Sequence, residues 1–202
     1  MNEQQLNELI LQSLEHEQGG VKVYQTALQC ARNSDLHEEW EKYLEQTTMH
    51  VETLTTLAQQ FGLDPAQETP GRKVVRMVGA ALVEAMRSAL DGGKPEAAEL
   101  VACECVVLAE TKDHLDWELL GKCAEKAKSM KLSDARVRAL SDAVALVEDQ
   151  EDEHLYHTKG WCRELWIQSL GMRAVLPPLE EQRDVKTAIG AARAEQASEK
   201  SR

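Results

Sequence analysis

The stretch EDQEDEHLYHTKGW, residues 148–161, places two histidines among five acidic residues. Carboxylate and imidazole groups are ligands that iron, manganese and zinc accept alike. Within the stretch, Glu151 and His154 are three residues apart, and on a helix this spacing puts both side chains on one face, one turn apart. The stretch therefore fits two interpretations: part of a metal site, or a solvated acidic helix face.

The apolar residues around this stretch indicate which side of the helix is buried, because helical residues turn by about 100° each. One apolar stripe is formed by Val144, Val147, Leu155, Cys162 and Leu165. Glu151 and His154 fall inside this stripe. Glu153 and His157 lie on the far side, where we expect a solvated i,i+4 pair. Glu148 lies at the edge of the buried face and fits either group.

Three other helix-forming stretches also carry acidic or histidine side chains within an apolar stripe: Glu17 in the first, His50 in the second, and Glu110 with His114 in the third. In the first stretch, Glu15 and His16 fall outside the stripe. In the second, Gln46 and Thr47 lie beside His50. Counted from the turns between the helices, these positions differ by about one or two helical turns. They could meet in one layer of a helical bundle.

The distribution of proline indicates how these helices are connected. No proline occurs before Pro65 or between Pro95 and Pro177, and both stretches are rich in good helix formers. Turn and capping residues near 33–35 and 133–134 divide each stretch into a helical hairpin. The expected helices are 4–32, 35–62, 96–130 and 134–170.

The segment between the hairpins, residues 62–97, is expected to be a long crossover that carries an extra short helix over VVRMVGAALVEAM, residues 74–86. Residues 1–176 then form one all-α four-helix bundle domain built from two hairpins. The polar segment 177–202 is expected to be a loosely attached helix or disordered.

The two hairpins also share a spacing between a glutamate and an aromatic residue. Glu17 precedes Tyr24 by seven residues, two helical turns, and Glu110 precedes Trp117 by the same seven. The interval from Tyr24 to His50 is about three turns shorter than the corresponding interval in the second hairpin, so equivalent faces stay buried. The halves look like diverged copies of one helical hairpin.

Charge and composition exclude several classes of partner. The 202 residues carry a formal net charge of −12, and basic residues form no cluster, which argues against nucleic acid and anionic membranes. The N-terminus lacks the pattern of a signal peptide, and no apolar run is long enough for a membrane span. We expect a cytoplasmic protein.

Three buried glutamates in one layer would repel one another unless they are protonated or neutralised by cations. Two divalent metal ions offset this charge, with histidines completing the coordination. Di-iron and di-manganese bundles use a glutamate on each of two helices and Glu-x-x-His on the other two for this reason.

On these residues, the chain resembles the ferritin-like superfamily over roughly residues 4–170. It is most similar to the small bacterial ferritin-like proteins associated with stress, through EQTTMHVETLTTLAQQFG (45–62) and the crossover GRKVVRMVGAALVEA. The resemblance implies that the metal ligands are Glu17, Glu110, Glu151 and His154, together with His50. The pattern expects a glutamate three residues before His50, where this chain has Thr47. His114 is the candidate substitute ligand, and Glu148 is a weaker candidate. An asymmetric site, a degenerate site with a single metal and a site that has lost its metal all stay open.

The resemblance implies iron as the metal, two ions if the site is intact, with manganese and zinc open. It also implies oxygen or peroxide chemistry: a di-iron oxidase or peroxidase activity that handles iron in oxidative stress. Metal ions and O2 or peroxide would be the partners, and assembly into a homo-oligomer stays open. The alternative is a metal-free structural or partner-binding bundle in which the same polar groups hydrogen-bond one another.

Overall fold

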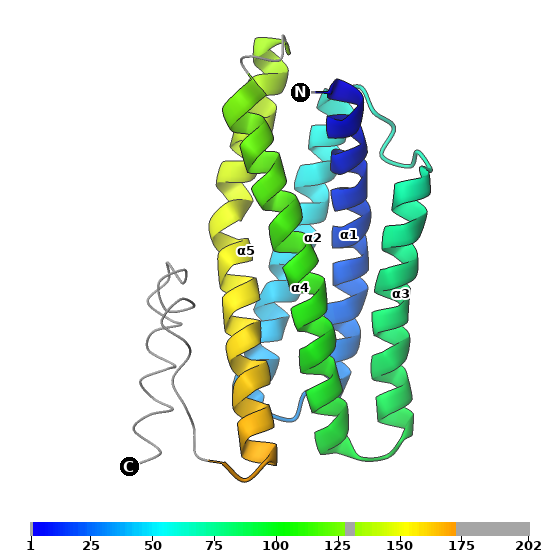
Figure 1. The fold of residues 1–202 in the computed structure, drawn as a ribbon, viewed down its shortest axis with the longest axis vertical. Helices are drawn as coiled ribbons and strands as arrows, with labels where there is room; N and C mark the ends of the chain where they lie inside the picture. The colour runs from blue at the N-terminus through cyan, green and yellow to red at the C-terminus, as the bar shows by residue number, and fades with distance from the viewer. Residues whose placement is uncertain (1, 128–131, 173–202) are drawn as a thin grey trace.

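The computed structural model describes residues 2–127 and 132–172, and over these residues it is helical with no strand. The helices are α1 (Glu3–Cys30), α2 (Ser34–Gln60), α3 (Pro70–Asp91), α4 (Pro95–Lys126) and α5 (Asp134–Ser169) (Figure 1). The predicted all-α class is confirmed. None of the described helices is both long and apolar enough to cross a membrane. The segment 177–202, predicted to be a polar tail, lies outside the described residues.

Helix ends follow the capping residues. The Asn33 side chain accepts hydrogen bonds from the backbone N–H groups of Asp35 and Leu36 at the start of α2. Ser133 caps α5 in the same way by accepting from the N–H of Arg136. Such caps satisfy N–H groups that have no partner within the helix. The predicted starts of α1, α2 and α5, which have such caps, agree with the structure to within one residue. The predicted start of α4 agrees equally well, although α4 has no side-chain cap and begins at Pro95.

The crossover helix is longer than predicted. α3 spans 22 residues, because the Thr69 side chain caps it and Pro70 occupies its first turn. Proline at this position costs no hydrogen bond, so Pro70 begins the helix rather than only ending what precedes it.

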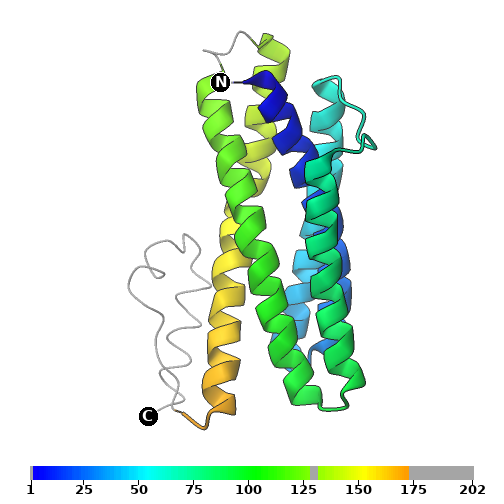
Figure 2. The same cartoon turned by 45° about the vertical axis from the view of Figure 1, so that its right-hand side comes forward.

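Four long helices pack as two antiparallel hairpins, with α1 against α2 and α4, and α5 against α4 and α2 (Figures 1 and 2). α3 lies along the outer side of α1 and α4. The bundle has two apolar clusters, one built around Tyr24, Trp40 and Val106 and the other around Ile10, Leu57 and Leu140. On each of the four long helices, the residues between these clusters include an acidic or histidine side chain of the predicted layer.

The burial of Glu15 differs from the sequence-based prediction, which puts this residue outside the buried face of α1. Glu15 is only 5 % exposed, because α3 covers that side of α1. Arg72 donates to Glu15 Oε2 over 2.9 Å, and Arg76 donates to both of its carboxylate oxygens. Hydrogen bonds from these arginines, Arg76 first, hold the pKa of Glu15 below its usual value despite burial.

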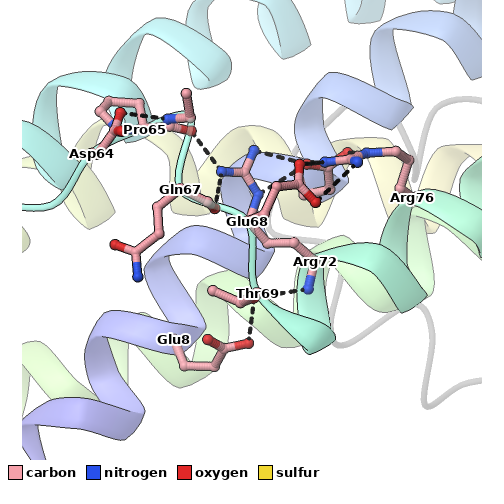
Figure 3. Close-up of polar contacts among 10 residues, drawn as sticks. Glu8, Asp64, Pro65, Gln67, Glu68, Thr69, Arg72 and Arg76 are labelled. Atoms are coloured by element: carbon pink, nitrogen blue, oxygen red, sulfur yellow. Dashed lines mark hydrogen bonds and ion pairs between the residues drawn. The ribbon is translucent and has the colours of Figure 1, made fainter.

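Besides its contact with Glu15, Arg72 also holds the crossover loop in place. Its side chain is 4 % exposed, and Nη1 donates to the carbonyl oxygens of Pro65 and Gln67 over 2.6 and 3.0 Å (Figure 3). Thr69 adds a hydrogen bond from its hydroxyl to Glu8 of α1. The crossover is therefore attached to α1 through buried polar contacts at the start of α3.

Candidate metal centre

Five side chains from α1, α2, α4 and α5 form a polar layer between the two apolar clusters: Glu17, His50, Glu110, Glu151 and His154. None of the five is more than 2 % exposed. The structure thus brings together five of the six residues that the sequence analysis proposed as ligands. Glycine at position 20 and Thr47 pack against each other beside the layer, since a Cβ on Gly20 would lie 3.2 Å from Thr47 Cγ2.

The layer contains two groups of ligand atoms, and they share one residue. Glu17, His50 and Glu151 form one group, and Glu110, Glu151 and His154 form the other, with the atoms of each group within 4.8 Å of one another. His50 Nδ1 is 3.3 Å from Glu17 Oε1 and 3.0 Å from Glu151 Oε1. His154 Nδ1 is 3.5 Å from Glu110 Oε2 and from Glu151 Oε1. Glu151 therefore lies between the two histidines.

Many atoms that face the centre of the layer have no hydrogen-bond partner among the described residues. They are Glu17 Oε2, His50 Nδ1, Glu110 Oε2, both Glu151 oxygens and His154 Nδ1. The short contacts to the histidine nitrogens have ion-pair distances without the direction of a hydrogen bond. Buried polar atoms are nearly always satisfied in folded proteins. Two cations among three carboxylates and two imidazoles would satisfy all of these atoms, so the residues present fit a di-metal site.

The outer nitrogens of both histidines are held by glutamines. His50 Nε2 lies 2.9 Å from Gln150 Oε1, and His154 Nε2 lies 2.9 Å from Gln46 Oε1. A carbonyl oxygen only accepts, so Nε2 is the donor in both contacts, and in the neutral form of either ring the lone pair of Nδ1 is directed at the centre. Partners of this kind orient the histidine ligands of metal sites.

The outer oxygens of two glutamates are held by aromatic side chains. Tyr24 donates its hydroxyl to Glu110 Oε1 over 2.9 Å, and Trp117 donates Nε1–H to Glu17 Oε1 over 2.8 Å. The seven-residue spacing that both hairpins share thus corresponds to a crosswise arrangement, in which each aromatic residue donates a hydrogen bond to the glutamate of the other hairpin. The glutamine contacts cross between the hairpins in the same way.

His114 does not join the layer. Its side chain is 23 % exposed, and Nε2 lies 2.8 Å from Asp152 Oδ1 on the neighbouring α5. Four residues exceed one helical turn, so His114 is rotated past Glu110 towards the flank between α4 and α5. Glu148, which fitted either face, is exposed.

His157 was predicted to lie on the surface, and this is wrong. It is 4 % exposed because it faces α2, where Nδ1 lies 2.9 Å from Glu39 Oε1 and 3.0 Å from the Tyr43 hydroxyl. Its expected i,i+4 contact with Glu153 exists at 3.8 Å, but the pair is not solvated, since the Glu153 side chain is 11 % exposed. The Tyr43 ring also contacts the His154 ring, with 4.2 Å between centroids.

Asp113 was missed by the sequence analysis. It is 3 % exposed, and its Oδ1 has no hydrogen-bond partner among the described residues. Burial, followed by the charges of Glu151, Glu17 and Glu110, raises its pKa well above the usual value. The available signal was its position three residues after Glu110, which puts both on nearly the same face of α4.

Burial and mutual repulsion also shift the pKa values of the layer. Burial raises the pKa of Glu151 to about 7, although His50 and His154 oppose this. Burial alone would lower the pKa of His50, but the close carboxylates of Glu151 and Glu17 outweigh it and raise the value to about 10. For Glu110, the contacts from His154 and Tyr24 outweigh burial and lower the pKa.

The metal-free protein is expected to lose stability as pH rises from 5.5 to 9. Both Glu151 and His50 have pKa values in the folded chain above their ordinary 4.5 and 6.5. A raised pKa stabilises the fold fully below the unfolded value, and this contribution is lost as pH rises through about 7 for Glu151 and about 10 for His50. Thermal unfolding of chelator-treated protein should show a midpoint lower by roughly 5 °C at pH 9. Glu151→Gln should flatten the part of the curve near pH 7, and a midpoint that rises with pH would contradict the expectation.

No family model, no curated protein and no solved structure matches this chain.

Proposed function

We propose that the protein is a ferritin-like metal-binding protein that holds two divalent cations, iron foremost, in the polar layer of its bundle. The observation that carries the proposal is the position of Glu151 in both ligand groups, with both of its oxygens lacking a hydrogen bond. The order of two hairpins joined by a long crossover supports the ferritin-like assignment.

Thr47 does not prevent two cations from binding under this proposal. Each group has its own glutamate and its own histidine, and Glu151 serves as the carboxylate common to both. One shared carboxylate would therefore suffice to link the two groups. The asymmetry leaves fewer protein ligands than the full superfamily pattern supplies.

Bound iron would supply electron exchange with O2 or peroxide, which is the basis for proposing a role in iron handling or peroxide removal during oxidative stress. The protein's own residues orient and isolate the site. Gln46 and Gln150 fix the histidine rings, while Tyr24 and Trp117 fix the two outer glutamates. The two apolar clusters exclude bulk water from both ends of the layer.

A metal-free structural bundle is the second candidate, and one observation favours it. His50 has a pKa raised to about 10, so at neutral pH it is positively charged and lies within 3.3 Å of two glutamates. A protonated His50 would neutralise part of the buried negative charge without any metal.

The test is a titration of the metal-free protein with ferrous iron under anaerobic conditions, read by native mass spectrometry. Wild type is expected to bind two ions, whereas Glu17→Gln and Glu110→Gln should each bind about one, because each residue belongs to only one group. Glutamine keeps an oxygen that can accept from Trp117 or Tyr24, so the fold should be preserved.

Glu52→Gln is the matched control, since Glu52 is an exposed glutamate of α2. It should bind as wild type does. A wild-type protein that binds no ferrous iron, manganese or zinc while remaining folded would reject the metal-binding function and favour the structural bundle.

A further inference from the structure

Asp113 is a buried carboxylate that the two ligand groups do not use. It lies on α4, one turn after Glu110, with an exposed fraction of 3 % and an Oδ1 that lacks a hydrogen bond. The charges that act on it come from Glu151, Glu17, Glu110 and Asp116. A buried carboxylate near other carboxylates is destabilising unless it takes up a proton or a cation compensates its charge.

Asp116, on the same helix, is a buried aspartate whose charge is compensated by a lysine. It is also 3 % exposed, but Lys112 forms an ion pair with it across one helical turn. No ion pair to Asp113 is found in the described part of the chain. Asp113 follows Glu110 by three residues, so it lies on nearly the same face of α4 as this residue of the polar layer.

The internal repeat explains why a carboxylate is found here. In the two hairpins Glu17 corresponds to Glu110, and His50 to His154. By the same count, Thr47 corresponds to Glu151, and Gly20 to Asp113, which follows its helix glutamate by three residues. The contact between Gly20 and Thr47 shows that these two positions abut in the first hairpin. The first hairpin thus has no carboxylate at either position, and the second has one at both.

The missing carboxylates of the first hairpin affect the charge balance of the proposed metal centre. Two divalent cations carry four positive charges, and Glu17, Glu110 and Glu151 supply three negative ones, with the histidines neutral. A site buried this deeply strongly favours neutrality. Asp113 would provide the fourth negative charge.

We propose that Asp113 is the fourth carboxylate of the metal centre and replaces, from α4, the carboxylate that position 47 of α2 lacks. This inference rests on the proposed function, because it assigns a residue to the same site. Asp113 would bind or directly neutralise the pair of cations through the unpartnered Oδ1.

The experiment compares Asp113→Asn with Asp116→Asn in anaerobic ferrous titrations followed by native mass spectrometry, and in cobalt(II) titrations followed by visible absorption. Asp113→Asn is expected to weaken binding of the second ion by roughly tenfold or more, and to change the cobalt spectrum. Asp116→Asn should keep wild-type binding. Thr47→Glu combined with Asp113→Asn should recover binding of the second ion.

Unfolding of the metal-free variants separates a ligand from a structural residue. Asparagine adds no negative charge, so Asp113→Asn should unfold at the wild-type temperature or above it. A lower midpoint together with unchanged metal binding would show a structural role and overturn the inference.

The two proposals fail in distinguishable ways. If wild type binds no metal, both the proposed function and the role of Asp113 are rejected. If wild type binds two ions and Asp113→Asn binds them equally well, or if both asparagine variants lose binding equally, only the role of Asp113 is rejected. Failure of Thr47→Glu to recover binding would reject the replacement of position 47.

Discussion

Replacing Glu151 with glutamine is expected to abolish binding of both cations, whereas loss of any other glutamate of the layer should remove at most one. Glu151 is the residue common to both ligand groups, and it is 1 % exposed, so no solvent molecule can easily take its place. The amide keeps the shape of the side chain and removes its charge. We expect affinity for each ion to fall by roughly 100-fold or more, beyond the ~10–100-fold typical of residues that only orient ligands.

Anaerobic ferrous titration of wild type, Glu151→Gln and Glu148→Gln would measure this effect. Glu148 lies one turn before Glu151 on α5 and is exposed, which makes it the matched control. Metal-free Glu151→Gln should remain folded, because it relieves repulsion with Glu17 and Glu110. Retention of one ion by Glu151→Gln would contradict a shared carboxylate and indicate two independent sites.

Replacing Arg72 with methionine is expected to destabilise the fold by about 3–5 kcal/mol, the usual cost of removing one partner of a buried ion pair. Arg72 is buried between α1, the crossover loop and α3, and its removal leaves the carbonyl oxygens of Pro65 and Gln67 without this donor. Glu15 would keep only Arg76, whose side chain is 45 % exposed. Denaturant unfolding monitored by circular dichroism measures the loss.

Arg76→Met is the comparison, because a half-exposed ion pair contributes about 1 kcal/mol or less. Equal destabilisation by the two variants would show that burial of Arg72 is not what holds the crossover. The contacts of Arg72 lie between α3, α1 and the crossover loop, whereas the polar layer lies in the bundle interior. Arg72→Met that still folds should therefore bind metal as wild type does. This separates anchoring of the crossover from assembly of the metal centre.

The sequence by itself determined the helices and most of the layer. Capping residues such as Asn33 and Ser133 act locally, so they locate helix starts without knowledge of the fold. Helical periodicity is also local, and it was enough to place Glu17, His50, Glu110, Glu151 and His154 on the buried faces of their helices.

The tertiary structure decided everything that depends on more than one helix. A single apolar stripe describes one packed face, but α1 is packed on two sides, by the bundle and by α3, so Glu15 is buried against Arg72 and Arg76. The environment of His157 depends in the same way on its packing against α2.

The geometry of the layer is likewise a property of the assembled bundle. Sequence spacing showed that Glu17 and Tyr24 share a face, but not that Tyr24 bonds to Glu110 of the other hairpin while Trp117 bonds to Glu17. Nor could it show that Glu151 lies between both histidines while His114 turns to Asp152. Periodicity fixes the direction of a side chain around its own axis, whereas the relative height and rotation of two helices come from packing between residues far apart in the chain.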